Sequence, residues 1–146
     1  MAATSRFLFD SNCWMEVVRS RPQAQLVQSP IAPPQTVLIT DFALFSVALA
    51  MRWHKVLDAI PTFIKQTGIG VGIEIVRLMP SDFAQVVEVC TSHTLDFDDA
   101  YQYVAAESNA LTLVSLDTDF DRTPRGRLTP AAALQRFTDE QEQQQP

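Results

Sequence analysis

Aspartates that directly follow apolar runs are the residues of this chain best suited to chemistry. A run at positions 7–9 is followed by Asp10. A second run, 111–116, leads into Asp117, with Asp119 two residues further on. Open parallel sheets bind their ligands at the carboxyl ends of their strands. The two runs therefore predict one shared, acid-lined site at such an edge.

A third aspartate, Asp99, lies near the start of a stretch with the periodicity of an amphipathic helix. Apolar residues recur there with helical spacing, at Phe97, Ala100, Tyr101, Val104 and Ala105. With a step of about 100° per residue, Asp99 lies away from the centre of this apolar stripe. Its carboxylate is thus free to join the other two at the same site.

Carboxylates that converge in this way need a cation. Two such charges about 4 Å apart repel by roughly 4 kcal/mol at an effective dielectric of about 20. Carboxylate and water oxygens are the ligands preferred by Mg²⁺ and Mn²⁺. These ions activate water and bind phosphoryl oxygens, so the implied chemistry is metal-assisted phosphodiester hydrolysis. Helix caps and turns also favour Asp, and among Asp10, Asp99, Asp117 and Asp119 that structural alternative applies most strongly to Asp119.

Alternating strands and helices are expected to position these residues. We predict strands over 6–10 and 73–79, helices over 42–53, 55–66 and 81–90, a helix from residue 97 and another over 128–137. The apolar run 37–39 is too short to classify. The helix over 42–53 is hydrophobic on most sides, which predicts an interior position. The alternation predicts an α/β fold in which helices cover a parallel sheet.

The chain of 146 residues has the length of one domain and a formal net charge of −6. We assign residues 1–138 to the domain and 139–146 to an acidic, Gln-rich mobile tail. The tail holds three of the 17 acidic residues, leaving 14 against 11 basic ones, so composition does not exclude a nucleic-acid partner. The sequence shows no secretory signal and no run of about 18 apolar residues, so we expect a cytoplasmic protein without a membrane partner.

Three acidic blocks of this sequence resemble those of the PIN-domain ribonucleases, and most closely the VapC-type toxins of bacterial toxin-antitoxin pairs. The blocks are Phe9-Asp10-Ser11-Asn12, Asp99-Ala100, and the run from Leu113 to Phe120. The step from Asp99 to Asp117 spans one helix, a tight turn and one strand, as it does in the family. The resemblance covers about residues 6–137.

This resemblance implies a metal-dependent endoribonuclease with a PIN-like α/β/α sandwich, in which helices flank a central, mostly parallel sheet. Such proteins are usually homodimers, act on RNA, with tRNA as one expected substrate, and are inhibited by a cognate antitoxin. Carried over by position, Asp10, Asp99 and Asp117 resemble the ligands of Mg²⁺ or Mn²⁺, with Asp119 in support and Ser11 and Asn12 orienting the first carboxylate. Three arginines that follow the third block, Arg122, Arg125 and Arg127, are expected to hold RNA phosphates.

One position departs from the family pattern. PIN domains normally carry a Glu on the helix after the second strand, about five residues beyond a Ser or Thr. Counting from Thr40, this chain has Phe45 there. Asp41, about one turn earlier, could substitute. The departure leaves an alternative open: a PIN-like module with weak or no catalytic activity that binds protein or RNA.

Overall fold

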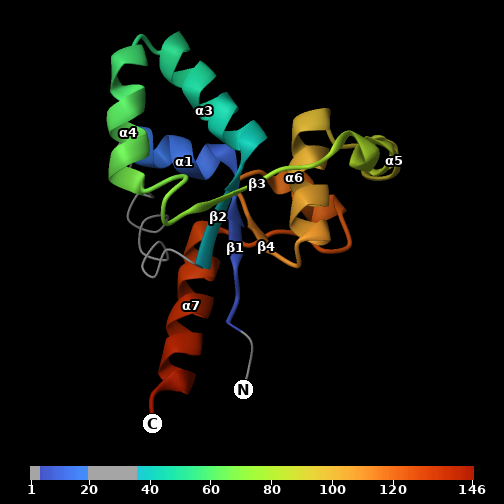
Figure 1. Cartoon of the computed structure of the whole chain (residues 1–146). Helices are drawn as coiled ribbons and strands as arrows, with labels where there is room; N and C mark the ends of the chain where they lie inside the picture. The colour runs from blue at the N-terminus through green and yellow to red at the C-terminus, as the bar shows by residue number, and fades with distance from the viewer. Residues whose placement is uncertain (1–3, 20–35) are drawn as a thin grey trace.

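The computed structural model describes residues 4–19 and 36–146, and its centre is a four-stranded sheet in which every pair of neighbours is parallel (Figure 1). The strands are β1 (Phe7–Phe9), β2 (Val37–Thr40), β3 (Glu74–Val76) and β4 (Thr112–Val114), and their order is β3-β2-β1-β4. The carboxyl ends of all four strands therefore lie at one edge of the sheet. The predicted α/β class is confirmed.

Helices cover both faces of this sheet. One face carries α1 (Ser11–Val18), α3 (Asp41–Trp53), α4 (Ile60–Thr67) and α7 (Pro130–Gln144), and the other carries α5 (Phe83–His93) and α6 (Phe97–Ser108). Short 3-10 turns, η3 (Leu57–Ala59), η4 (Pro80–Asp82) and η5 (Thr118–Arg122), complete the described elements. Figure 1 shows α1, α3 and α4 on one side and α5 and α6 on the other. This is the α/β/α sandwich that the sequence predicts.

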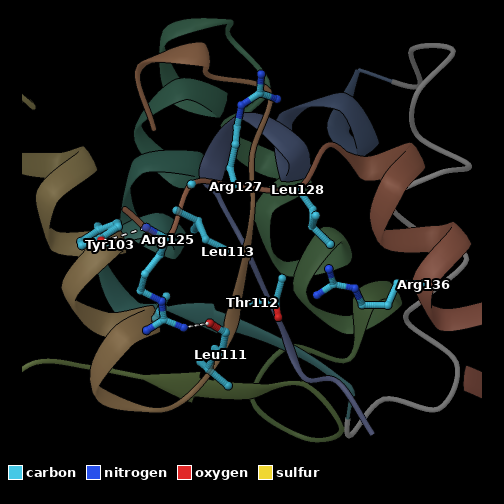
Figure 2. A pocket seen from close by; sticks show the side chains of 10 residues that line it. Tyr103, Leu111, Thr112, Leu113, Arg125, Arg127, Leu128 and Arg136 are labelled. Atoms are coloured by element: carbon cyan, nitrogen blue, oxygen red, sulfur yellow. Dashed lines mark hydrogen bonds between the residues drawn. The ribbon is translucent and has the colours of Figure 1, made fainter. Parts of the chain in front are cut away.

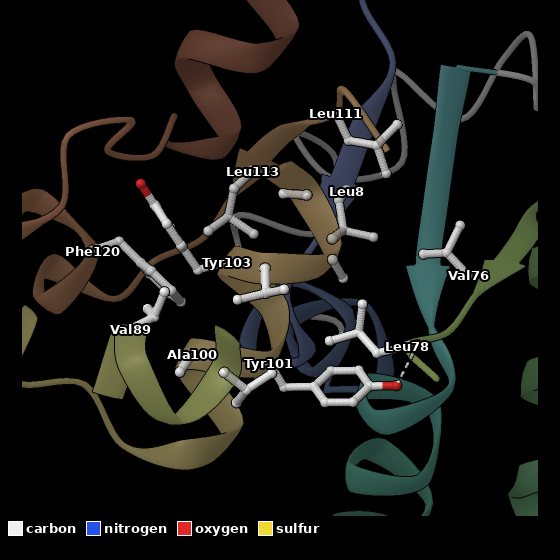
Figure 3. Packing of buried hydrophobic residues seen from close by; sticks show 14 of the residues in the cluster. Leu8, Val76, Leu78, Val89, Ala100, Tyr101, Tyr103, Leu111, Leu113 and Phe120 are labelled. Carbon is white, nitrogen blue, oxygen red and sulfur yellow. Dashed lines mark hydrogen bonds between the residues drawn. The ribbon is translucent and has the colours of Figure 1, made fainter. Parts of the chain in front are cut away.

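Two hydrophobic clusters hold the layers together. Along β1 the side chains alternate, so Phe7 and Phe9 enter the cluster under α1 and α3, whereas Leu8 enters the cluster under α5 and α6. All three are fully buried. Figure 3 shows the second cluster, where the Tyr101 ring packs beneath β2 and its hydroxyl accepts a hydrogen bond from the backbone N–H of Leu78 at 2.9 Å.

Two strands add to or correct what the sequence predicts, namely β2 in the middle of the sheet and β3 at its edge. The unclassified run 37–39 is β2, which pairs with β1 and β3 and is buried at every residue. Strand β3 is shorter than the predicted 73–79, because the backbone of Leu78 bonds to Tyr101 rather than to β2 and Pro80 opens η4.

The helix α3 corrects one expectation. Its apolar composition predicts an interior helix. One side fits this prediction, because Ala43, Val47 and Met51 are buried. The opposite side exposes Phe45, Leu49 and Trp53, at 67%, 66% and 85% of their surface. The prediction of an interior helix is therefore wrong for half of its circumference. No helix in the described ranges is long and apolar enough to cross a membrane.

The chain ends in a long helix. α7 runs through Gln144, so the predicted boundary at residue 138 lies inside it. The Glu140 carboxylate accepts hydrogen bonds from the backbone N–H and the hydroxyl of Ser5. The segment expected to be a tail is thus helical up to Gln144, and its mobility and the division of the chain remain predictions.

Candidate metal centre

The site begins where β1 ends. Asp10 leaves the strand with extended backbone angles and caps α1, its Oδ1 accepting the N–H of Ser11 at 2.8 Å. Its own N–H donates to the carbonyl of Val114 at 2.9 Å, which ties this point of the chain to the end of β4. The Asp10 side chain is only 5% exposed because helices close over both faces at this edge.

Ser115, just past β4, connects the two strand ends. Its Oγ donates to Asp10 Oδ2 at 2.8 Å and accepts from the backbone N–H of Asp117 at 3.0 Å. Asn12 Nδ2 also donates to this oxygen, at 3.0 Å, and Asn12 Oδ1 accepts the N–H of Leu116. Ser11 therefore contacts the Asp10 carboxylate directly, whereas Asn12 acts on it through Ser115.

Three carboxylates converge beside this connection. One oxygen each of Asp99, Asp117 and Asp119 lies within 4.8 Å of the other two, and all three residues are partly buried. The side chain of Asp117 is oriented by the N–H of Asp119, which donates to its Oδ1 at 2.8 Å. The structure thus brings together the aspartates of the second and third sequence blocks, with Asp119 as a full member.

This donor set fits a hard divalent cation. Ligands about 2.1 Å from an octahedral Mg²⁺ lie roughly 3–4 Å from one another, so the three oxygens need only a small closure to share one ion. Asp10 lies next to this group without being part of it, and its oxygens accept four hydrogen bonds, two from Ser11 and one each from Gln102 and Ser115. A second group, Asp96, Asp98 and Asp99, has two exposed members and shares Asp99 with the first.

Burial and nearby charges disfavour the charged form of Asp99, and burial disfavours that of Asp10. The pKa of Asp99 is raised to about 7, first by desolvation and then by the charges of Asp98, Asp10, Asp117 and Asp119. Burial also raises the pKa of Asp10, against the lowering effect of its hydrogen bonds from Ser115 and Gln102. Arg122 pairs with Asp119 at 3.4 Å at the solvent side. A bound cation would offset the remaining repulsion.

The α3 side of the site differs from the predicted pattern. Asp41 belongs to neither carboxylate group, and its Oδ1 accepts hydrogen bonds from the Tyr101 hydroxyl and the N–H of Phe42, each at 2.8 Å. Phe45 is largely exposed to solvent. Within the described ranges, α3 therefore adds no carboxylate to either group, and a substituting role of Asp41 stays a prediction.

Two of the three predicted RNA-binding arginines contact backbone near the site. Arg122 donates to the carbonyl of Thr94 at 2.6 Å, and Arg127 donates to the carbonyl of Ser115 at 3.1 Å and pairs with Asp121 at 3.2 Å. Arg125 lies at the beginning of β4, at the end opposite the carboxylates, where it donates to the carbonyl of Leu111 at 2.9 Å. Each of the three side chains is therefore held by a contact within the protein. Binding of RNA by these arginines remains a prediction.

Sequence reasoning missed Gln102. It is 2% exposed on α6, its Nε2 donates to Asp10 Oδ1 at 3.1 Å, and its Oε1 accepts from the hydroxyl of Thr40. Thr40 in turn caps α3 by accepting the N–H of Ala43. Gln102 thus links the first aspartate to the start of α3. In the sequence it lies outside the apolar stripe, where a Gln looks like an ordinary surface residue.

Comparison with known protein families identifies the fold. The family model described as PIN domain matches residues 7–126, which include all the strands and every carboxylate of the site. The chain belongs to the PIN-domain family. A search of curated protein sequences finds no match.

Solved structures share the arrangement of this PIN domain at low sequence identity. The PAE2754 protein of Pyrobaculum aerophilum superposes with a TM-score of 0.71 at 19% identity, over 95% of this chain and 99% of that one. A toxin-antitoxin complex from Klebsiella pneumoniae gives 0.66 at 22%, over 84% and 96%. The Mycobacterium tuberculosis VapC20 toxin, described as cleaving the sarcin-ricin loop, gives 0.65 at 12%, over 79% and 92%. These likenesses establish the fold.

Proposed function

We propose that this PIN domain is a Mg²⁺- or Mn²⁺-dependent endoribonuclease that acts as a VapC-type toxin. The observation that carries the proposal is the convergence of Asp99, Asp117 and Asp119 within 4.8 Å, next to the buried Asp10. Membership of the PIN family and the likeness to a toxin that cleaves RNA support the same function.

In this proposal the chain's own residues hold the ion and fix its surroundings. Asp99, Asp117 and Asp119 would hold the ion, with Asp10 as a further ligand directly or through water, and the ion would supply an activated water and offset charge on the phosphodiester. Ser115 keeps the Asp10 carboxylate at a fixed position relative to Asp117, because one hydroxyl bonds to both residues. Arg122, at the solvent side of Asp119, is placed to bind a phosphate of the RNA.

We also propose two protein partners, a cognate antitoxin and a second copy of the chain. The exposed apolar side of α3, formed by Phe45, Leu49 and Trp53, is a surface of the kind that a protein partner covers. One solved relative of similar fold is a toxin-antitoxin complex. We place the protein in the cytoplasm, where its RNA substrate, such as tRNA, would be found.

A cleavage assay on total RNA and on tRNA tests the proposed activity. The wild type is expected to cut RNA in Mn²⁺ or Mg²⁺ and to stop when EDTA is added. Asp117→Asn should abolish cleavage, because the substitution removes a ligand charge while retaining the side-chain shape. Asp58→Asn, at an exposed position of η3, is the matched control and should cut as the wild type does. Cleavage that persists in EDTA and in Asp117→Asn would rule out the proposal.

Among the described residues, α3 adds no carboxylate to either acidic group, and this favours a second candidate, a PIN domain that binds RNA or protein with little or no catalysis. The same assay separates the two candidates when metal binding is measured beside it. Stabilisation of the protein by Mn²⁺ together with RNA turnover supports the nuclease. Mn²⁺ and RNA binding without turnover supports the binding module.

A further inference from the structure

A cavity of about 150 Å³ lies along the outer edge of β4, away from the carboxylates (Figure 2). Its walls come from α6, the residues 111–113, the segment 125–128 and Arg136 of α7. The segment 125–128 pairs with β4 only near Val114, where Leu128 forms a parallel bridge. The beginning of β4 is therefore left open toward this cavity.

The charge of the cavity is opposite to that of the whole chain. Arg125, Arg127 and Arg136 line it and no acidic residue does, although the net charge of the protein is −6. The Arg127 guanidinium is already bound to Ser115 and Asp121 and points away from the other two. Arg125 and Arg136 extend toward the strand near Thr112 from different sides (Figure 2).

Both of these arginines retain hydrogen-bond donors. Arg136 makes no hydrogen bond or ion pair with the residues that the structure describes, and the Glu140 carboxylate one turn further along α7 is occupied by Ser5. Arg125 donates from Nη2 to the carbonyl of Leu111, which leaves the rest of its guanidinium available. A guanidinium carries five N–H donors in a planar fork that matches the oxygens of a phosphate.

The strand adds polar groups of its own. The N–H of Thr112 donates to Arg6 on the β1 side, whereas the carbonyl of Leu113 accepts from Leu128 on the outer side. Because alternate residues of a strand direct their backbone groups to opposite sides, the N–H of Leu113 also faces the outer side. The Thr112 hydroxyl lies between the two arginines in Figure 2. Guanidinium, hydroxyl and backbone donors thus surround one small space.

We propose that this cavity binds a phosphate of an RNA strand at a distance from the bond that is cut. The proposal rests on the proposed nuclease function. Thr112 lies five residues before Asp117, or about 17 Å along an extended chain. That is roughly five nucleotides of a stacked strand at about 3.4 Å each. The cavity would therefore anchor the substrate several nucleotides from the carboxylate group.

RNA binding by Arg136→Gln tests this site, because Arg136 has no described partner whose loss would disturb the fold. Anisotropy of a labelled RNA of about 12 nucleotides is measured in EDTA, which prevents turnover. Arg52→Gln, at an exposed position of α3, removes the same charge elsewhere. We expect Arg136→Gln to weaken binding at least about tenfold and to lower the salt dependence of log K by about 0.7, and Arg52→Gln to change neither.

Cleavage kinetics and inorganic phosphate provide two further readouts. In Mn²⁺ the Arg136→Gln variant should show a raised KM for the RNA of about 12 nucleotides with an unchanged kcat. If the wild type cleaves RNA but Arg136→Gln binds and cleaves it equally well, the site is refuted while the nuclease function stands. If the wild type does not bind RNA but binds inorganic phosphate in an Arg136-dependent way, RNA as the ligand is refuted, and the proposed function with it. Unchanged melting temperatures exclude a folding defect.

Discussion

At the scale of single residues, the hydroxyl of Ser115 determines how the two strand ends sit relative to each other. A hydroxyl offers one donor and two acceptor positions, and here all three are used, by Asp10, Asn12 and Asp117. The Asp10 carboxylate is therefore held in one orientation before any ion arrives. Beside it, the carboxylates of Asp99, Asp117 and Asp119 lie close enough together for their charges to repel.

This repulsion predicts the effect of Asp117→Asn on stability. Two charges about 4.8 Å apart repel by about 1 kcal/mol even at the dielectric of water. The Asn side chain still accepts the N–H of Asp119, so the cap of η5 is retained. In EDTA we expect Asp117→Asn to raise the melting temperature by about 3–6 °C, while the stabilisation by Mn²⁺ disappears.

Differential scanning fluorimetry measures both effects, with and without Mn²⁺. Asp58→Asn removes one exposed charge outside the site and should change the melting temperature by less than about 1 °C. A melting temperature of Asp117→Asn equal to that of the wild type in EDTA would contradict the repulsion argument.

The raised pKa of Asp99 predicts how stability depends on pH. In the unfolded chain this carboxyl has its ordinary pKa near 3.8, and in the folded protein its pKa is about 7. Between these values the folded state binds the extra proton, so the metal-free protein should lose stability as the pH rises through about 7. Mn²⁺ competes with that proton, so its stabilising effect should grow over the same range.

Melting temperatures from about pH 5 to about pH 8, in EDTA and in Mn²⁺, check this expectation. Asp99→Asn keeps the side-chain shape and removes the titrating group, so its metal-free stability should lose this pH dependence. A wild type whose Mn²⁺ stabilisation is constant over this range would show that Asp99 does not titrate at the ion.

The aspartates could be predicted from the sequence, because each follows a local pattern: an apolar run that ends in acid, or the start of a periodic helix. Gln102 and Ser115 could not. Gln102 bonds to Thr40 and Asp10, and Ser115 bonds to Asp10, over more than 60 residues of chain, so no local pattern shows these contacts. Asp41 shows the opposite limit of sequence patterns. Its acidic side chain lies near the position expected for the helix Glu, but it accepts a hydrogen bond from the Tyr101 hydroxyl.

At the scale of elements, α6 joins the site to the core. Every residue from Ala100 to Ala106 is buried, so this helix has no solvent-facing side in its middle. Gln102 is polar in this surrounding and is satisfied by Thr40 and Asp10. Gln102 thus adds a polar link between α6 and the ends of β1 and β2 to the apolar packing of this helix.

Truncation of that amide should be costly. In Gln102→Ala, Asp10 loses a donor, the Thr40 hydroxyl loses its acceptor and a cavity remains, which together should reduce the free energy of unfolding by about 3 kcal/mol. Gln85→Ala is the control, because Gln85 bonds to Glu107 at an exposed position and should cost less than about 0.5 kcal/mol. Urea unfolding measures both, and equal losses would contradict the role of Gln102.

The helix α3 shows what composition leaves undecided. A helix that is apolar on most sides fits a domain interior and equally fits a surface covered by another chain. The exposed Phe45, Leu49 and Trp53 are spaced four residues apart and form a continuous stripe. Only the packing of α1 and α4 beside α3 shows which side is covered within the chain.

This stripe should mediate association with a second copy. Leu49→Lys places a charge at its centre, so we expect a dimer in the wild type and a monomer in the variant, with little change in unfolding free energy because Leu49 is 66% exposed. Size-exclusion chromatography with light scattering measures the mass. Lys55→Leu, near the end of the helix, is a control that removes a charge. A wild-type monomer would contradict the homodimer.

At the scale of the whole molecule, the sheet divides the core into two clusters, and β1, β2 and β4 contribute side chains to both. Phe9 and Ile39 belong to the side of α1, α3 and α4, and Leu8 and Leu38 to the side of α5 and α6. Strand-helix alternation was sufficient to predict this layered arrangement. The strand order was not predictable, because it depends on pairings between β1 and segments 30 and 105 residues away.

Because both clusters include side chains of the same short strands, neither can unfold alone, and the chain should unfold in one step. In a Trp53→Phe background, Trp14 is the only indole and reports on the first cluster. Its fluorescence and the far-ultraviolet circular dichroism should give the same urea midpoint.

Leu8→Ala and Ile39→Val, on opposite faces of the sheet, should lower that midpoint because they reduce the free energy of unfolding by about 3 and about 1 kcal/mol. Two separated transitions would mean that the layers are independent, in which case the carboxylates contributed by β1, α6 and β4 would not stay together on partial unfolding.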